Sequence, residues 1–284
     1  MAIKFDSFIA KETKTLIVDA LNLAFRWKHQ GKTDFVAEYI NTVASFAKSY
    51  KCTNIIITAD QGSSSYRKRI LPEYKQNRKE KYAKQTPEEA EAFKRFFIEY
   101  ERVLYTLSDM YTVLQHKETE ADDLAAYLVK HKDRYNLGDI VLISTDRDWD
   151  LLIQEGVMRF SYVTRKEVTM ENWNEHYEVP REQYACFKCL TGDKGDNVPG
   201  FAGIGPKRAT DLLKEYGSAY NIYDSVPIES KYKYMQEINE NPDKILRNYE
   251  LMDLLTHCED AIGYELPNLV RRMEDYGPIS TIYS

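Results

Sequence analysis

Leu16-Ile17-Val18-Asp19 is a short apolar run that ends in a carboxylate, and the pattern recurs along the first half of the chain. Residues 54–60 (NIIITAD) repeat it, and residues 140–146 (IVLISTD) repeat it again. A further apolar run covers residues 111–114. Short apolar runs separated by helical segments are typical of a sheet buried on both faces. The sequence therefore predicts an α/β fold with a central, mainly parallel sheet flanked by helices.

Three of the four predicted strands end in an aspartate, namely Asp19, Asp60 and Asp146. Carboxyl ends of parallel strands meet at one edge of a sheet, and ligands of open α/β sheets bind just outside that edge. We therefore expect the functional site there.

The composition describes a globular protein with an acidic balance. The chain has 284 residues, 43% of them apolar, which is enough for a sizeable core and suggests about two domains. Taken alone, a formal net charge of −6 argues against a nucleic-acid partner. No stretch has the roughly 18 apolar residues of a membrane span, and the first residues lack the apolar core of a signal peptide. With only four cysteines, the chain is expected in the cytoplasm, without a membrane partner.

A basic insert lies between the second and third predicted strands. Residues 66–84 (YRKRILPEYKQNRKEKYAK) hold eight Lys or Arg against two Glu, a local charge of +6. Residues 86–89 (TPEE) form a capping box that opens a helix to about Leu107. A basic run is most often a solvated surface. Its place beside strands that end in carboxylates favours a functional interpretation.

Acidic residues gather at five places that the prediction brings to the sheet edge. Helical spacing puts Glu120 and Asp123 on one face. Gly192 and Gly195 allow a tight turn beside Asp193. The nine residues are Asp19, Asp60, Glu120, Asp122, Asp123, Asp146, Asp148, Asp193 and Asp196.

So many carboxylates in one cleft predict a site for divalent cations. A single aspartate after a strand is often only a turn or N-cap residue, but five such places together fit that interpretation poorly. Converging carboxylates raise one another's pKa unless cations neutralise them, and all-oxygen ligands suit Mg²⁺ or Mn²⁺. Two such ions about 3.5–4 Å apart would activate a water and stabilise the leaving oxygen of a phosphodiester.

A family resemblance supports this prediction. It rests on six elements in order: IVDALNL (17–23), ITAD (57–60), ETEADD (118–123), ISTDRDWD (143–150), TGDKGDN (191–197) and PGFAGIGPKRA (199–209). Together they resemble the flap endonuclease/5′-exonuclease family, most closely its bacteriophage members, from about residue 14 to about residue 215. The resemblance implies a structure-specific, metal-dependent 5′ nuclease with 5′-3′ exonuclease activity in DNA replication. Such an enzyme hydrolyses branched or 5′-ended DNA at 5′ flaps and single-strand/double-strand junctions. We expect it to be a monomer, in the host cytoplasm if it is phage-encoded.

The resemblance also implies roles for single residues. Asp19, Asp60, Glu120, Asp122 and Asp123 would serve one ion, and Asp146, Asp148, Asp193 and Asp196 the other. The family has a helical arch where the insert 66–110 stands. Lys75 and Arg78 match cations at the arch base that approach the scissile phosphate, where they would stabilise developing charge. Tyr74, in the same motif, and Lys188 are expected to contact DNA.

Gly203-Ile204-Gly205 resembles the loop of a helix-hairpin-helix at about residues 198–215. Its glycines would let backbone N–H groups approach a duplex phosphate, and Lys207 and Arg208 would add sequence-independent attraction. In the family this loop also holds a potassium ion, which makes K⁺ a candidate second cofactor. A plain turn would explain the motif about as often.

We expect a nuclease core over residues 1–185, including the insert, and a helical region over residues 186–284. The chain departs from the family pattern at Arg147, where related phage enzymes often carry a small residue, so that local backbone freedom is lower. No polymerase domain or sliding-clamp motif is recognisable. Phe96-Phe97 falls within a helical pattern and is expected to pack internally.

Two other interpretations stay open. Asp146-Arg147-Asp148 after a strand is also typical of a DxD phosphatase, which leaves Asp193, Asp196 and the insert unexplained. A non-catalytic junction-binding protein would explain the hairpin and the insert. Its nine carboxylates would, however, repel phosphate unless cations intervened.

Overall fold

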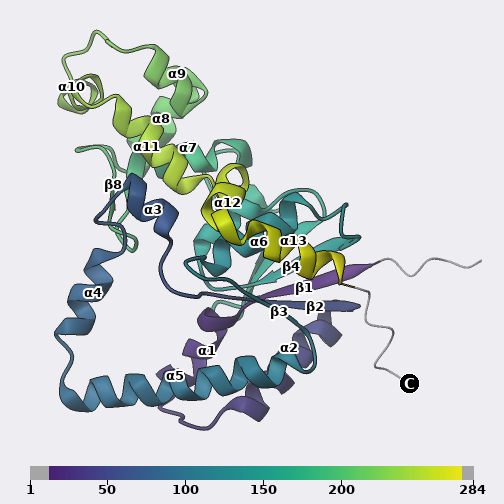
Figure 1. Ribbon diagram of the computed structural model, residues 1–284. Coiled ribbons are helices and arrows are strands. Elements are labelled where there is room, and N and C mark those ends of the chain that lie inside the picture. Colours follow the sequence, from purple (N-terminus) through teal and green to yellow (C-terminus); the bar gives the residue numbers. More distant parts are fainter. Residues whose placement is uncertain (1–12, 277–284) are drawn as a thin grey trace, which may run out of the picture.

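The computed structural model describes residues 13–276, and a six-stranded sheet lies at its centre (Figure 1). The strand order is β3-β2-β1-β4-β5-β6, and all neighbours are parallel except β5 and β6. The predicted α/β fold with a mainly parallel sheet is confirmed. The strands are β1 (Lys14–Asp19), β2 (Asn54–Ala59), β3 (Thr112–Gln115), β4 (Asp139–Ile143), β5 (Val157–Ser161) and β6 (Lys166–Val168).

The sequence prediction missed β5 and β6. In β5 (VMRFS), a buried arginine, Arg159, interrupts the apolar run. The short β6 pairs antiparallel with β5 and has two exposed residues out of three. Neither strand therefore carries the uninterrupted apolar signature of a central parallel strand.

Helices cover both faces of the sheet because successive side chains of each strand point to opposite sides. Leu16 and Val18 of β1 pack toward the helices α1, α2 and α5, whereas Ile17 packs toward α6. All three side chains are fully buried, and each contributes about 1.5–3 kcal/mol from burial alone. These helices are α1 (Ala20–His29), α2 (Val36–Tyr50), α5 (Pro87–Ser108) and α6 (Ala121–Lys130).

The segment between β2 and β3, which contains the basic insert, forms three helices: α3 (Ser65–Ile70), α4 (Gln76–Ala83) and α5. The predicted capping box is present, since Thr86 and Glu89 each accept a hydrogen bond from the backbone N–H of the other. No residue of α4 is buried. Figure 1 shows α4 running from the region of β8 to the start of α5, so that the insert forms an elbow at the side of the sheet. Phe96 packs in the core between α5 and α1, as expected.

The last third of the described chain is helical. One helix of this region ends at Met252, and Asp253 starts the next one. The side chain of Asp253 accepts from Thr256 N at 3.1 Å, as an N-cap does. A further helix follows over Leu266–Glu274. The elements of this region are α7 (Tyr184–Thr191), β7 (Gly192–Asp193), β8 (Val198–Pro199), α8 (Pro206–Tyr216), α9 (Ala219–Asp224), α10 (Lys233–Glu240), α11 (Asp243–Met252), α12 (Leu254–Ile262) and α13 (Leu266–Glu274).

Within residues 13–276, no helix is both long and apolar enough to cross a lipid bilayer. The division of the chain into domains at residues 185 and 186 stays a prediction.

Candidate active site

Parallel pairing brings the ends of β1, β2 and β4 to one edge of the sheet. Asp19 ends β1 and caps α1, accepting from Asn22 N at 3.1 Å and from Ser144 Oγ at 2.8 Å. Asp60 follows β2 and accepts from Ala121 N, at the start of α6, at 2.7 Å. Asp146 follows β4. One hydrogen bond therefore links the ends of β1 and β4, and another links the end of β2 to the start of α6.

The second acidic group stands at the start of α6. Glu120 is the N-cap residue, and the carboxylates of Glu120 and Asp123 face the same partner, the buried Arg67. Arg67 makes a bidentate ion pair with Asp123, at 2.8 Å and 2.6 Å. Asp122 points elsewhere and accepts from Trp149 Nε1 at 2.6 Å.

Asp146 and Asp148 lie on the short 3₁₀-helix η1 (Arg147–Leu152). Asp146 is its N-cap residue and accepts from Asp148 N at 2.9 Å. The ammonium of Lys188 on α7 contacts Asp148 and Asp193, the latter at 3.0 Å. This contact ties η1 to the hairpin of β7 and β8.

That hairpin carries Asp193 and Asp196. Asp193 Oδ1 accepts from Gly195 N at 2.7 Å and from Asp196 N at 3.2 Å, so the two carboxylates share a tight turn. Gly192 has φ 72°, and a Cβ there would lie 2.1 Å from Gly200 N. The turn therefore requires glycine at position 192.

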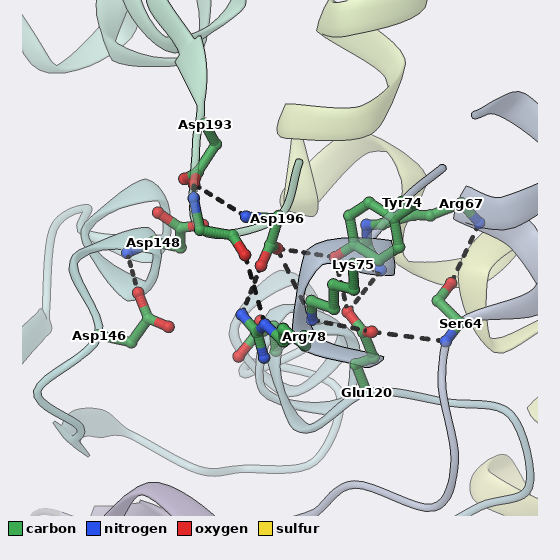
Figure 2. Close-up of polar contacts among 12 residues, drawn as sticks. Ser64, Arg67, Tyr74, Lys75, Arg78, Glu120, Asp146, Asp148, Asp193 and Asp196 are labelled. Carbon is green, nitrogen blue, oxygen red and sulfur yellow. Dashed lines mark hydrogen bonds and ion pairs between the residues drawn. The ribbon is translucent and has the colours of Figure 1, made fainter. Parts of the chain in front are cut away.

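The base of the insert reaches into this acidic cluster (Figure 2). Lys75 Nζ lies 2.9 Å from Glu120 Oε1 and 3.6 Å from Asp196 Oδ2. Arg78 Nη2 lies 2.5 Å from Asp196 Oδ1. The hydroxyl of Tyr74 lies 3.0 Å from Glu120 Oε2 and 2.9 Å from Asp196 Oδ2. Residues 74–78 thus bring cations from the insert to carboxylates on two distant segments.

Lys75 has a left-handed backbone, with φ 55°, and its N–H donates to Asp196 O at 2.9 Å. Such a conformation is strained for a residue with a Cβ and persists only where its surroundings hold it. The geometry fixes the direction in which Lys75 enters the cluster.

Burial and mutual repulsion raise the pKa values of several of these carboxyl groups. Burial and the nearby Asp60 raise the pKa of Asp19 to about 8. Burial raises the pKa of Asp148 to about 6, although Lys188 opposes the shift. Burial and Asp146 also raise the pKa of Asp122. The site therefore holds more acidic groups than the described protein neutralises.

Glu120 shows the effect of adequate neutralisation. Burial disfavours its charged form, but Lys75 and Arg67 outweigh that cost and hold its pKa at about 2. The contrast with Asp19 shows that nearby cations lower the pKa of a buried carboxyl group where their attraction outweighs the cost of burial.

The ligand atoms available at this site are carboxylate oxygens, the type of ligand that hard divalent cations such as Mg²⁺ prefer. Asp122, Asp148 and Asp196 line one small cavity of about 10 Å³, the size of one water. As they stand, no three acidic, histidine or cysteine side chains within residues 13–276 are arranged to hold a metal ion. Lys75 and Lys188 instead contact four of the carboxylates.

The glycine loop at the start of α8 is a separate basic surface. Gly203 has φ 79°, and Gly205 caps α8 without a side-chain hydrogen bond. Lys207 is exposed. Arg208 donates to Gly203 O at 2.6 Å and lies 4.8 Å from the ring centroid of Tyr234. Arg208 therefore braces the loop as well as charging it.

Sequence reasoning missed three residues that organise the site: Arg67, Ser144 and Trp149. Arg67 was counted in the basic insert, yet its partner Asp123 lies 56 residues away. Ser144 and Trp149 flank the predicted Asp146 motif but carry no charge. Charge and spacing point to the acids and give no signal for the groups that hold them.

Two family models match adjoining parts of the chain. Residues 14–178 match the 5′-3′ exonuclease, N-terminal resolvase-like domain. Residues 179–275 match the 5′-3′ exonuclease, C-terminal SAM fold.

Similar proteins come from phage and bacteria. The flap endonuclease of Escherichia phage T5 is 42% identical over 259 residues, 90% of this chain and 88% of that protein. A flap endonuclease of Shewanella woodyi is 29% identical, over 85% of this chain and 92% of that protein. A crystal structure of the T5 flap endonuclease, described as a pseudo-enzyme-product complex with DNA and metal ions, is 37% identical. It has a TM-score of 0.86 and covers 92% of this chain and 99% of that one.

Proposed function

This chain belongs to the 5′-3′ exonuclease family, and from that membership and its site we propose that it is a structure-specific, divalent-metal-dependent 5′ nuclease. It hydrolyses DNA phosphodiesters at 5′ flaps and single-strand/double-strand junctions and acts as a 5′-3′ exonuclease in DNA replication. One observation carries the proposal. Cations at the base of a basic insert meet the carboxylates at the carboxyl edge of the sheet.

The cofactor of this reaction is proposed to be Mg²⁺ or Mn²⁺, as about two ions. Asp19, Asp60, Glu120, Asp122 and Asp123 would serve one ion, and Asp146, Asp148, Asp193 and Asp196 the other. When bound, the ions would supply an activated water and stabilise the leaving oxygen. The raised pKa values of Asp19 and Asp122 support this proposal, because a divalent charge would let both groups ionise.

Besides its proposed place in the metal site, Asp123 forms a structural ion pair. Both its oxygens accept from the buried Arg67, whose Nη1 also lies 3.5 Å from Glu120. The pair joins α3, at the start of the insert, to the first turn of α6. Asp123 would thus hold the insert in place beside the proposed metal site.

Lys75 and Arg78 are the proposed catalytic cations. Both now contact carboxylates that would hold metal ions, and each side chain comes from the insert where a 5′ strand would pass. They would exchange these contacts for the scissile phosphate and stabilise the charge that develops there. Tyr74 and Lys188 are proposed DNA contacts. Lys188 is buried between Asp148 and Asp193. It would therefore contact a DNA phosphate only if that phosphate lay beside these two carboxylates.

The loop from Gly203 to Gly205 is proposed to bind the duplex backbone. The N-terminus of α8 has no side-chain cap, so its N–H groups are available to a phosphate, with Lys207 and Arg208 beside them. A potassium ion at the carbonyls of this loop remains part of the proposal. Arg208 already donates to one of these carbonyls, that of Gly203.

We also propose a monomeric protein that works in the cytoplasm of the host cell, without a sliding-clamp motif. The four cysteines, Cys52, Cys186, Cys189 and Cys258, support a reducing compartment because all are free thiols and three are buried.

A phosphatase and a non-catalytic junction-binding protein are the competing functions. One experiment separates all three. A 5′-labelled flap, a flap with a blocked 5′ end, a nicked duplex and single-stranded DNA are incubated with Mg²⁺ or with EDTA, beside a small phosphomonoester. The nuclease should cleave flaps only with Mg²⁺. Faster turnover of the phosphomonoester would favour a phosphatase, and tight junction binding without any cleavage a binding protein.

Replacing Asp146 tests the metal site directly. Asp146→Asn keeps the size of the N-cap residue of η1 but removes one negative charge. We expect Mg²⁺-dependent cleavage to be abolished while junction binding, measured by fluorescence anisotropy, persists. Near-normal turnover would contradict the assignment.

A further inference from the structure

Arg147 lies between Asp146 and Asp148 in the sequence, and its side chain contacts Tyr177. Its guanidinium carbon lies 5.0 Å from the ring centroid of Tyr177, and its Nε donates to the Tyr177 hydroxyl at 3.3 Å. Arg147 itself is exposed. The backbone that carries two proposed metal ligands is therefore anchored through the side chain between them.

The anchor point is itself fixed. The ring of Tyr177 stacks on that of buried Trp173, with centroids 4.4 Å apart. Its hydroxyl donates to Asp150, which is fully buried. Asp150 also forms a bidentate ion pair with Arg159 of β5, at 2.5 Å and 2.8 Å. Such a buried, fully paired group has little freedom to move.

The same network returns to the strand ends. Arg159 Nη1 donates to Ser144 O at 3.0 Å. The hydroxyl of Ser144 donates to Asp19 at 2.8 Å and accepts from Asp146 N at 3.1 Å. One connected set of contacts thus runs from Arg147 through Tyr177, Asp150, Arg159 and Ser144 to the carboxylate of Asp19 and the backbone N–H of Asp146.

Side-chain anchors matter here because η1 is a 3₁₀-helix of six residues. Its hydrogen bonds have poorer geometry than those of an α-helix, so the backbone alone holds its first turn weakly. A cation on an exposed aromatic face usually contributes only a small stabilisation of the fold. At this position the contact is made by the residue between Asp146 and Asp148.

We infer that Arg147 is a positioning residue, which locks the turn of Asp146 and Asp148 against Tyr177 and so preorganises the divalent-metal site. The inference rests on the proposed metal-dependent function. Partners that orient metal ligands typically change metal affinity or activity by about 10–100-fold when they are removed.

The test uses the full-length protein with Arg147→Ala, which removes the anchor at an exposed position. Arg134→Ala is the matched control, because Arg134 also lies over a tyrosine ring, Tyr135, at 5.2 Å. Arg134 follows the C-terminal end of α6, whereas the carboxylates lie at the N-terminal end of that helix. Mn²⁺ binding is measured by calorimetry without DNA, together with the melting temperature in EDTA. We expect Arg147→Ala to weaken Mn²⁺ binding about tenfold, with Arg147→Lys intermediate and Arg134→Ala unchanged.

The kinetics of flap cleavage provide a second measurement. With a labelled flap, kcat should fall while KM stays within about twofold, since the substrate contacts are unchanged. Tyr177→Phe keeps the ring and removes the hydroxyl, so its effect on Mn²⁺ affinity should not add to that of Arg147→Ala. Unchanged Mn²⁺ affinity would overturn the inference. So would a salt slope of DNA binding that falls by about one unit, which would make Arg147 a phosphate anchor. Calorimetry decides the point even if no flap is cleaved, so failure of the proposed function is seen separately.

Discussion

Lys75 is the single residue on which the largest number of site properties depends. It has a left-handed backbone, donates its N–H to Asp196 O and places its ammonium between Glu120 and Asp196. Burial disfavours the charged ammonium, but Glu120 outweighs that cost and raises its pKa. Lys75 therefore stays charged across the working range of pH, as an electrostatic stabiliser of phosphate must.

Replacement of Lys75 by alanine should slow the chemical step. We expect single-turnover cleavage of a flap to fall by roughly 10²-fold or more, because a cation near the scissile phosphate acts mainly in the transition state. Quenched-flow measurement at saturating enzyme gives this rate. Lys79→Ala, on the exposed side of α4, removes the same charge and should leave the rate nearly unchanged. A weaker affinity with an unaltered rate would make Lys75 a phosphate anchor only.

At the scale of single elements, the proposed metal edge of the sheet and the proposed duplex-binding loop are separate parts of the structure. The loop from Gly203 to Gly205 opens α8 with uncapped N–H groups, and Arg208 holds the loop through Gly203 O. Lys207 stands free at this end of the helix, whereas Lys214 lies in its last turn. The two lysines allow a test in which the change of charge is the same and only the place differs.

Lys207→Ala should weaken duplex binding and reduce the slope of log K against log salt by about one unit. Lys214→Ala should leave the slope within error of the parent protein. Binding of a nicked duplex in Ca²⁺, followed by anisotropy from 50 to 200 mM salt, provides the measurement. If the parent protein and Lys207→Ala had equal salt slopes, Lys207 would not be part of the duplex interface.

Local pattern made some elements predictable and left others hidden. The strands that lead to Asp19, Asp60 and Asp146 were predicted because each is a contiguous apolar run with a carboxylate at its end or shortly after it. The capping box of α5 is equally local. By contrast, the buried Arg159 interrupts the apolar run of β5, and the Arg67–Asp123 pair depends on a partner 56 residues along the chain, which no short window of sequence contains. The family resemblance was also predictable, and the two family models confirm it.

At the scale of the whole molecule, an excess of buried acid links stability to pH. The pKa of Asp19 rises from 3.8 to about 8, so the folded protein binds a proton that the unfolded chain has released in this interval. Stability without metal must therefore fall as pH rises through this window. Asp148, raised to about 6, acts in the same direction. Glu120, at about 2, acts in the opposite direction but only below pH 5.

In EDTA, we expect a higher melting temperature at pH 5.5 than at pH 8, by at least about 2 °C. Addition of Mg²⁺ at pH 8 should reverse the loss, because the ion replaces the proton as the neutralising charge. Scanning calorimetry of the full-length protein measures both effects. Asp19→Asn carries no charge at either pH and should flatten the difference. A protein that is more stable at pH 8 in EDTA would contradict the pKa assigned to Asp19.

The ion pairs of Lys75, Arg78 and Lys188 have one more consequence. These side chains act as resident counter-ions, and each occupies oxygens that an incoming metal would need. A DNA phosphate that drew these side chains away would free those oxygens for the metal, so binding of the nucleic acid and binding of the ion would be coupled. Thermodynamic reciprocity then requires each to tighten the binding of the other. Metal affinity measured on the protein alone will accordingly understate the affinity that operates once a strand is engaged.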